Sequence, residues 1–577
     1  MFNRKQFLLL LIVLITTVVV AQEREQDTLN PDVINVIKPY TPTISDAFKV
    51  KETPVLDVEE TTTKKEIKYN ILSFPVASTF TPAKGKAAVV DKAKKVKLFD
   101  NYATLGVGTY TTIVGEVYLN HELSSGENIS AHLGHHSSGG GIEGVLLDDD
   151  FMDSKFDLDY SKRESDYDWN IGGGFQLQAF NWYGLPQPLF SQATADAIGD
   201  VGHNFTNAHL SGDLNVNDSF FKSANLLFRR FGDNQGSGEN RFTAKSTFDI
   251  PVQEELVSVV LNLDYLGGSF DRSYLAETAL NYGNFQLGIS PTYELKQEDL
   301  TVDLGVTATY LNDTETGKNK FFIYPNISAS YRLLDDLAIA FGGIKGGLIQ
   351  NTYFDFAQEN PFVSPTLNIS PTDQQFDAYV GLKGKLSNVV SYAIKGSYGS
   401  EKNKPLFVNN PITETEQAYT YGNSFGVVYD DVTTLGLSGE IGVDVNRNFT
   451  MTLKGAYYHY DTKFESEDWN LPDVTASLFL DYQLFEQWYT GVNVFFAGER
   501  KDQFTIINPS FPTAYTTYAA TLESYFDANA HVGYHVNDRL SVFVKGNNLV
   551  GETYAKWQNT PVQGIQFLAG GTYKFDF

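Results

Sequence analysis

The chain has 577 residues, which is long for one ordinary domain and suits one large barrel. It holds 33 Tyr, 42 Phe and 48 Gly but only 3 Met and no Cys. This composition is typical of β-structure with aromatic girdles and does not suit a helical protein. The missing Cys excludes disulfides and thiol chemistry. The formal net charge of −27 argues against nucleic-acid binding, which needs a basic surface.

Residues 1–21 have the pattern of a secretory signal peptide. The basic pair Arg4-Lys5 precedes an apolar run, and Ala21 offers a small residue for cleavage. The run is short and basic on its N-terminal side only, which favours a cleaved signal over a transmembrane anchor. We therefore expect export through the inner membrane and a mature chain that starts after Ala21.

Residues 22–97 differ in composition from the rest of the chain. Proline recurs, lysine is frequent toward the end of the segment, and the apolar residues follow no sustained period. The pattern indicates an extended segment that lies in the periplasm or in the lumen of a barrel. Within it, Lys38, Pro39, Tyr40 and Pro42 are candidates for docking a periplasmic partner as an extended peptide.

Residues 98–577 show apolar residues in alternation with polar ones. From Leu300 to Tyr310 every second residue is apolar, and the residues between them are Thr, Asp or Gly. Residues 435–445 and 474–483 repeat the pattern. Such alternation predicts strands with one oily and one wet face. Because strands recur without a helical interruption, a transmembrane barrel is favoured over a soluble sandwich.

The connections between these strands are expected to alternate in length. Outer-membrane barrels have short periplasmic turns and long extracellular loops. The sequence therefore predicts an all-β, antiparallel transmembrane barrel of about 22 strands, with 424–445 as one long strand that keeps the number even. Short turns are predicted near 124–128, 165–168, 216–218, 296–299, 334–336, 445–448 and 536–539, and long loops over about 182–202, 268–281, 351–373, 403–421 and 501–522.

The loop over 351–373 is rich in aromatic side chains. Phe354, Phe356, Asn360 and Phe362 are candidates for residues that constrict the pore or contact a ligand. A packing role at the barrel mouth is the alternative.

Clusters that would carry chemistry are weak. His132, His135 and His136 have no carboxylate at matching spacing, so polar residues at the aqueous rim are favoured over a metal site. The acidic run 148–153 lacks the Gly and the spaced ligands of a calcium loop, so a solvated acidic loop is favoured there. No nucleophile, metalloprotease or phosphate-loop motif is present. We expect a protein that is not an enzyme and has no cofactor or metal.

The chain ends on an aromatic residue of an alternating strand. Tyr573, Phe575 and Phe577 share one face of this strand, and Lys574 and Asp576 lie on the other. A terminal aromatic in this position resembles the signal read by the barrel-assembly machinery. That resemblance implies the machinery as a partner during biogenesis and outer-membrane lipid as the final surroundings.

The residues upstream add a family resemblance. A strand opens at Tyr525, a second runs over 540–549 and ends on Asn548-Leu549, and Tyr554 follows. This looks like the closing strands of TonB-dependent receptors, in a style similar to those of Bacteroidota. The resemblance implies a location in the outer membrane and uptake of a solute. Such receptors carry a folded plug before the barrel, and 22–97 is too short and too rich in proline to form one.

Two functions follow from these observations. The first is passage or uptake of a solute across the outer membrane, with loops or the segment 22–97 acting in place of a plug. The second is a structural barrel in an envelope complex for protein export or barrel assembly, which docks a periplasmic partner through 22–97. The sequence names neither the solute nor the partner.

Overall fold

The computed structural model describes residues 98–577 except 188, 254, 414–416, 446–447 and 508–514. The chain divides into two units, Met1–Lys92 and Ala93–Phe577, and all described residues lie in the second. The predicted signal peptide and the proposed docking residues Lys38, Pro39, Tyr40 and Pro42 lie outside the described residues and stay predictions.

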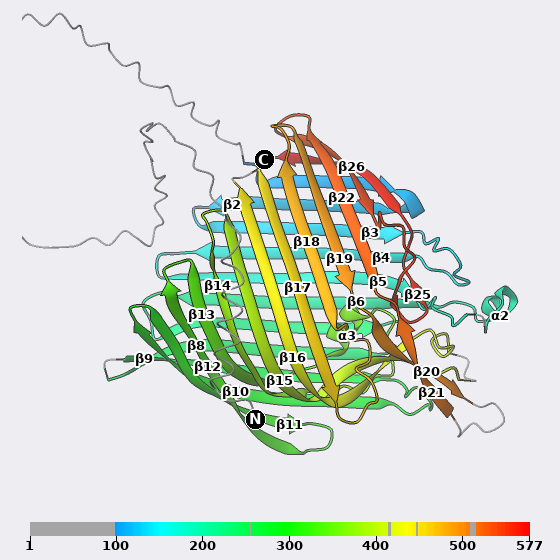
Figure 1. Cartoon of the computed structure of the whole chain (residues 1–577), viewed down its shortest axis with the longest axis horizontal. Coiled ribbons are helices and arrows are strands. Elements are labelled where there is room, and N and C mark those ends of the chain that lie inside the picture. The colour runs from blue at the N-terminus through cyan, green and yellow to red at the C-terminus, as the bar shows by residue number, and fades with distance from the viewer. Residues whose placement is uncertain (1–97, 188, 254, 414–416, 446–447, 508–514) are drawn as a thin grey trace, which may run out of the picture. The chain divides into compact units, whose positions relative to one another are not determined.

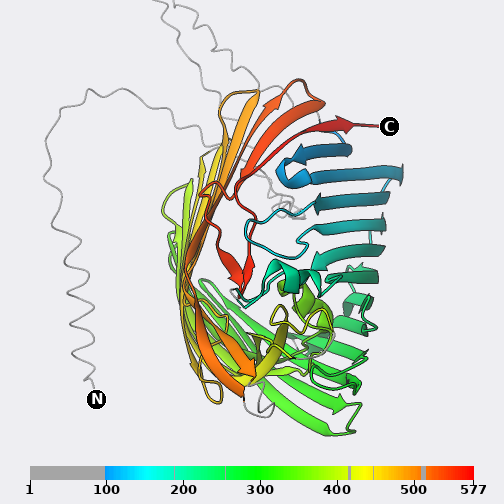
Figure 2. The same ribbon diagram turned by 90° about the vertical axis from the view of Figure 1, so that its right-hand side faces the viewer.

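Twenty-two antiparallel strands form one closed barrel (Figures 1 and 2). Consecutive barrel strands pair with each other, and β26 pairs back with β1, so that Asn101 lies opposite Phe575 and Gly108 opposite Leu568. Closure of the barrel pairs every strand on both sides. A structure that spans a membrane needs this, because lipid offers no hydrogen bonds to an unpaired strand edge. The prediction of an antiparallel barrel of about 22 strands is confirmed.

The elements lie in the following order. The barrel strands are β1 (Asn101–Gly108), β2 (Ile113–Ser124), β3 (Glu127–Ser138), β4 (Phe151–Arg163), β5 (Tyr167–Asn181), β6 (Gly202–Val216), β7 (Phe221–Asp233), β8 (Gly238–Val252), β9 (Glu255–Phe270), β10 (Leu280–Gln297), β11 (Leu300–Asp313), β12 (Asn319–Leu334), β13 (Ala338–Ile349), β14 (Thr372–Lys385), β15 (Val390–Asn409), β16 (Phe425–Val445), β17 (Phe449–Thr462), β18 (Val474–Gln483), β19 (Trp488–Ala497), β22 (Tyr525–His535), β23 (Leu540–Asn547) and β26 (Gln566–Phe575). The loops carry a 3-10 turn (Thr109–Thr111), the helices α2 (Gln192–Asp196) and α3 (Tyr353–Glu359), and the hairpins β20 (Arg500–Ile507) with β21 (Tyr515–Leu522) and β24 (Ala555–Trp557) with β25 (Thr560–Pro561).

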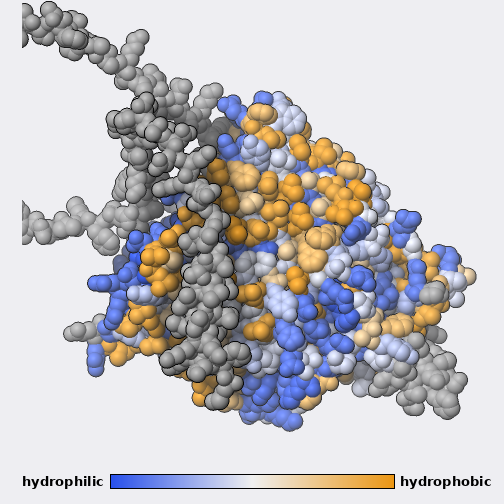
Figure 3. All heavy atoms as spheres, viewed as in Figure 1, coloured by the Kyte–Doolittle hydropathy of each residue, from blue (hydrophilic) through white to orange (hydrophobic). Residues whose placement is uncertain are grey.

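The two faces of the barrel wall differ as the alternation predicts. On β11, Leu304, Val306 and Tyr310 are exposed on the outer face, whereas Asp303 lies on the opposite face and accepts a hydrogen bond from Ser328. Hydrophobic side chains gather on the outer face over β18, β19 and β22 (Figure 3). An apolar outer face in contact with lipid and a polar inner face define a transmembrane barrel. Among the described residues, no helix is long and apolar enough to cross a membrane.

The connections differ sharply between the two ends of the barrel. Short turns join β2 to β3, β4 to β5 and the later pairs at one end, where β1 begins and β26 finishes. At the other end lie the long loops, among them 182–201, 350–371 and 498–524. The predicted loops 182–202 and 351–373 therefore match closely. The short-turn end is periplasmic and the long-loop end extracellular in barrels of this kind.

The predicted long strand over 424–445 is also correct, as β16. The register between β15 and β16 shifts near the middle of β16, because Glu401 pairs with Val432 but Lys404 pairs with Asp430. Two residues of β15 thus face one of β16, which is a β-bulge. Asn403 in the bulge has a φ of 58°, a backbone conformation that Asn tolerates better than most residues.

Candidate functional site

The loop between β13 and β14, residues 350–371, folds inward at the extracellular end of the barrel. Figure 2 shows this segment and its helix α3 between the two walls. Thr352 caps the helix by accepting a hydrogen bond from the Asp355 backbone N–H at 2.9 Å. A short capped helix inside the barrel mouth is the main candidate for a functional element.

Aromatic packing holds α3 against the barrel wall. The Tyr353 ring lies 5.1 Å from that of Phe231 and 4.9 Å from that of Phe270, and all three side chains are fully buried. Edge-to-face contacts at these distances stabilise aromatic pairs beyond the burial of their area. The apolar cluster at the mouth comprises Phe205, Phe231, Leu266, Phe270, Tyr282, Tyr353, Phe356, Ala357, Val363, Leu367, Ile369, Phe407, Phe425 and Trp557. We call this set the mouth cluster.

Glu239 on β8 holds the N-terminus of α3. Its carboxylate accepts hydrogen bonds from the backbone N–H of Tyr353 at 2.7 Å and of Phe354 at 3.3 Å. The Tyr282 hydroxyl donates a third hydrogen bond at 2.9 Å. The carboxylate thereby satisfies the first N–H groups of the helix, and a negative charge there also interacts favourably with the helix dipole. Glu239 is only 1% exposed, so this anchor is shielded from water.

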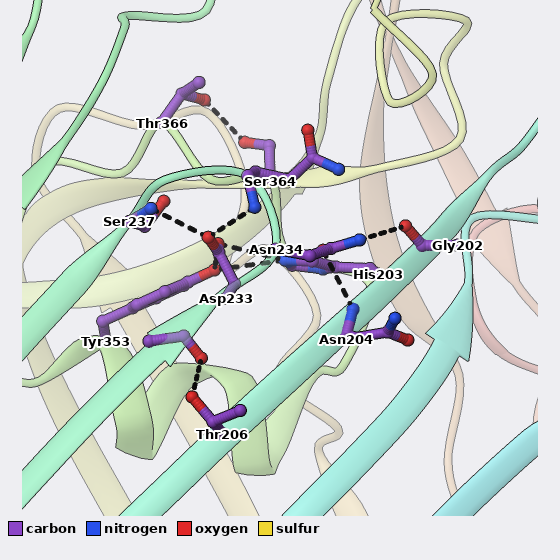
Figure 4. A network of polar contacts seen from close by, with 12 residues as sticks. Gly202, His203, Asn204, Thr206, Asp233, Asn234, Ser237, Tyr353, Ser364 and Thr366 are labelled. Atoms are coloured by element: carbon purple, nitrogen blue, oxygen red, sulfur yellow. Dashed lines mark hydrogen bonds and ion pairs between the residues drawn. The ribbon is translucent and has the colours of Figure 1, made fainter.

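A second anchor joins α3 to the ends of β6 and β7. The Tyr353 hydroxyl donates to Asp233 at 2.6 Å, and His203 Nε2 lies 3.2 Å from the same carboxylate oxygen. Tyr353 and His203 both point toward Asp233 (Figure 4). Burial and the nearby Asp233 carboxylate raise the pKa of Tyr353 well above its usual value, so its hydroxyl keeps the proton that it donates.

Cationic side chains pack on the exposed side of the helix. The Arg229 guanidinium lies 3.8 Å from the centre of the Phe354 ring. Arg241 makes a two-pronged contact with Asp264, at 3.1 and 2.7 Å, and lies 3.7 Å from Asp355. The cation–π contact joins α3 to β7, whereas the bidentate ion pair lies within the wall, between β8 and β9, and places Arg241 near Asp355 of the helix.

The four residues singled out in this loop have different surroundings. Phe356 and Asn360 are buried, with exposed fractions of 4% and 0%, whereas Phe354 and Phe362 are partly buried. These residues therefore pack at the mouth, and their role in constricting the pore stays a prediction. Whether these side chains contact a transported molecule stays a prediction.

The loop is also joined to the extracellular end of β16. Val363 forms a parallel bridge with Phe425, and the Ser364 N–H donates to the Phe425 carbonyl at 2.8 Å. Tyr429 continues this contact, because its hydroxyl donates to the Asn368 carbonyl at 2.9 Å. The loop is thus bound to opposite walls of the barrel, on β8 and on β16.

The lumen wall below the mouth is polar and open to water. His132 on β3 lies 3.1 Å from Glu116 on β2 and 3.6 Å from Asp157 on β4, and Asp157 lies 3.7 Å from His209 on β6. The carboxylate partners of His132 come from adjacent strands, which is why none stands at matching spacing in the sequence. Among the described residues, no three such side chains are gathered closely enough to hold a metal ion.

The other predicted features occupy ordinary structural positions. Asp149 accepts hydrogen bonds from the N–H groups of Gly141 and Ile142, so this part of the acidic run closes its own loop. Tyr573 is exposed on the outer face of β26, and the Phe575 ring lies 5.6 Å from that of Phe577. A role of these three aromatic residues in barrel assembly stays a prediction.

The hairpin of β20 and β21 contributes a buried carboxylate near the mouth. Asp502 is fully buried and accepts hydrogen bonds from the N–H groups of Asn409 at 3.0 Å and Gln503 at 2.7 Å. Burial raises the pKa of Asp502 to about 7, against the opposing effect of these hydrogen bonds and of nearby Arg500. This carboxyl group therefore changes charge near neutral pH.

Sequence reasoning did not find the anchors of α3. Glu239 and Tyr353 are 114 residues apart, and Asp233 and Tyr353 are 120 apart. No local pattern could link them, since the contacts arise only after β7 and β8 are placed beside the loop. A polar residue at the mouth-side end of a strand was the available signal, but many strands have one.

The chain was compared with known proteins. No family model and no curated protein matches it, whereas many solved structures do. The ferripyoverdine receptor of the outer membrane of Pseudomonas aeruginosa is 13% identical, with a TM-score of 0.58 over 84% of this chain and 73% of that one. The FrpB iron transporter of Neisseria meningitidis is 10% identical, with a TM-score of 0.62 over 83% and 82%.

The ferric-catecholate import receptor Fiu of E. coli K12, in a closed form, is 10% identical, with a TM-score of 0.56 over 82% of each chain. These proteins are TonB-dependent receptors. The chain shares their barrel fold. At such low identity the likeness concerns the fold alone, and the Bacteroidota origin and the missing plug stay predictions.

Proposed function

We propose that the chain is an outer-membrane receptor barrel that takes up a solute, and that the loop 350–371 is its movable constriction. The observation that carries this proposal is the pair of buried anchors, Glu239 and Asp233, which hold α3 across the mouth of a barrel whose wall below is polar. A polar lumen suits passage of a hydrophilic molecule. The fold shared with iron and siderophore receptors supports uptake rather than catalysis.

A planar-bilayer conductance measurement tests the constriction. Residues 353–369 are replaced by a short Gly-Ser linker in the purified barrel, and the short loop 314–318 is replaced in the same way as a control. We expect the first variant to conduct severalfold more than the wild type, because the mouth cluster no longer covers the lumen. The control variant is expected to conduct like the wild type. Equal conductance of the wild type and the first variant would show that the loop does not constrict the pore.

Deletion of residues 22–97 forms the companion measurement. A rise in conductance would mean that this segment adds to the closure of the lumen. Stoichiometric co-purification of an envelope protein that is lost on deletion would instead support the alternative, a structural barrel that docks a partner. The uptake proposal expects no such obligatory partner and expects conductance that depends on the added solute.

A further inference from the structure

A small cavity lies beside the loop 350–371 at the extracellular end of the barrel. Its volume is about 280 Å³. The walls come from the β3–β4 loop, the ends of β5 and β22, the loop 350–371 and the segment after β23. A cavity enclosed by segments this far apart in sequence forms only in the folded barrel, and its size suits a small molecule rather than a large chelate.

Two residues that line this cavity each carry a buried side-chain oxygen with no hydrogen-bond donor among the described residues. These oxygens are Oδ1 of Asp527 and Oδ1 of Asn548. Asn548 is only 4% exposed, and its Nδ2 donates to the carbonyls of Glu552 and Gln563, both at 2.9 Å. The amide is therefore fixed with its oxygen free. Buried acceptors without a donor are costly, so a molecule that brings N–H groups would bind favourably here.

The cavity is also acidic. Asp149, Asp150 and Asp527 line it, and the described residues of its lining include no Lys or Arg. Asp149 is occupied by backbone N–H groups and Asp150 by the Asn181 amide. Asp527 has one oxygen bound to the Tyr554 hydroxyl at 2.8 Å and one free. The net negative charge selects a cation.

Aromatic rings complete the lining. Phe151, Phe180, Tyr183, Phe362 and Tyr554 all contribute to it. The Tyr554 ring stacks on Tyr525 with centroids 3.9 Å apart, which fixes its orientation. Ring faces attract cations, most strongly where water is excluded.

The guanidinium of Arg500 is engaged by groups other than Asp527. Arg500 lies 5.5 Å from the Tyr525 ring and donates to the carbonyls of Lys556 and Ala555. Its charge is therefore directed at backbone oxygens and at Tyr525 rather than at Asp527. The carboxylate of Asp527 is left as the group that a bound cation would meet.

We infer that this cavity binds a small organic cation with a primary ammonium group, whose N–H groups donate to Asp527 and Asn548. The charge separates this class from a neutral polyol, which could also donate hydrogen bonds but would gain nothing from the three carboxylates. The further step of calling this cation a substrate of the barrel rests on the proposed uptake function. Binding at the cavity does not require transport.

The cavity shares residues with the constriction. Pro361 and Phe362 line it from the loop 350–371, and the Phe362 ring lies 5.3 Å from that of Tyr183. A bound cation would therefore touch the element that narrows the mouth. Movement of Phe362 would alter the cavity and the constriction together.

Calorimetric titration of the purified full-length barrel in detergent tests the inference. The probe is 1,4-diaminobutane, with 1,4-butanediol as the neutral control and succinate as the anionic control. We expect the diamine to bind and the diol to bind with an affinity at least about tenfold lower. Succinate is expected to show no binding. Binding of the diol as tightly as the diamine would overturn the assignment to a cation, and no diamine binding would overturn the site.

Asp527→Asn is the deciding variant, because it removes the charge and keeps an oxygen for the Tyr554 hydroxyl. We expect this variant to bind the diamine with an affinity at least about tenfold lower than that of the wild type. Asp538→Asn, in the short turn at the other end of β22, is the matched control and is expected to bind like the wild type. Circular dichroism checks folding, and Asp150→Asn replaces Asp527→Asn if that variant does not fold. Unchanged binding by a folded variant would overturn the site.

Vesicle flux separates this inference from the proposed function. If the diamine binds but does not cross a vesicle membrane that holds the barrel, the binding site is supported and uptake of organic cations is contradicted. If another solute crosses but the diamine does not bind, the uptake function is supported and the cation site is contradicted.

Discussion

The mouth of the barrel and the lumen wall beneath it are built from the same strands in different ways. At the mouth, Phe231 and Tyr353 have no exposed surface. On the wall, the side chains of Glu116 and Asp157 are 42% and 32% exposed. Hydrogen-bonded strands form the wall at both levels, but among the described residues the buried hydrophobic clusters lie where a loop enters. Packing at the mouth therefore depends on side-chain contacts of the loops, whereas the wall depends on the hydrogen bonds of its backbone.

The largest effect is expected from Phe231→Ala in the mouth cluster. The ring contacts Phe205, Tyr353 and Phe354 with centroids 5.4, 5.1 and 5.3 Å away, so its loss leaves a cavity. We expect the docked state of α3 to lose about 3 kcal/mol. Hydrogen exchange of the α3 amides measures this loss.

Phe228→Ala is the matched control, on the same strand and facing outward. It is expected to leave exchange in α3 unchanged, although it removes the same side chain. Equal acceleration by both variants would mean that α3 is not held by the mouth cluster, and the comparison between mouth and wall would lose its basis.

Glu239→Gln is expected to weaken the docking of α3 by about 2 kcal/mol. The amide offers one acceptor in place of two and brings a donor toward the N–H groups of Tyr353 and Phe354. Glu294→Gln on the wall, where the carboxylate is half exposed beside Lys296, is the control and should change little. Hydrogen exchange in α3 reports both. If Glu239→Gln hardly changes hydrogen exchange in α3, the helix is held at the mouth by apolar packing alone.

The barrel itself was predictable from the sequence because its cause is local. Alternation such as that of 300–310 encodes the two faces of a strand, and the contrast of short turns and long loops encodes the two ends. Even the stacked pair Tyr525 and Tyr554 belongs to a stretch that was recognised from its residues. Each of these features needs only near neighbours in the chain.

The mouth could be predicted only in part. An aromatic loop inside a barrel was expected, and Phe356 does lie in the buried cluster. Its anchors Glu239, Asp233 and His203 could not be found, because register and barrel closure decide which distant strands meet the loop. The same limit explains His132, whose carboxylate neighbours become visible only when the strand pairing is known.

Asp502 provides a test of pH dependence at the mouth. Its pKa is raised by burial to about 7, so the docked hairpin is favoured while the group is protonated. This stability is complete below about pH 4 and is lost as the pH rises through 7, since an undocked Asp ionises with its ordinary pKa.

From pH 6 to 8 we expect the opening equilibrium of β20 to rise about tenfold. Hydrogen exchange of β20, corrected for the intrinsic pH dependence of exchange, measures it. Asp502→Asn is expected to abolish the pH dependence. A pH dependence that survives this substitution would assign it to another group.

The smallest effect is expected from His132→Ala on the lumen wall. Its ring is partly exposed, and its contacts with Glu116 and Asp157 are screened by water, so we expect a change in unfolding free energy within about 0.5 kcal/mol. His203→Ala is the contrasting variant, because this ring is fully buried 4.2 Å from that of Trp182 and 4.1 Å from that of Phe205. It is expected to cost several times more and to speed exchange in α3. Equal losses in the two histidine variants would show that the wall is packed as tightly as the mouth.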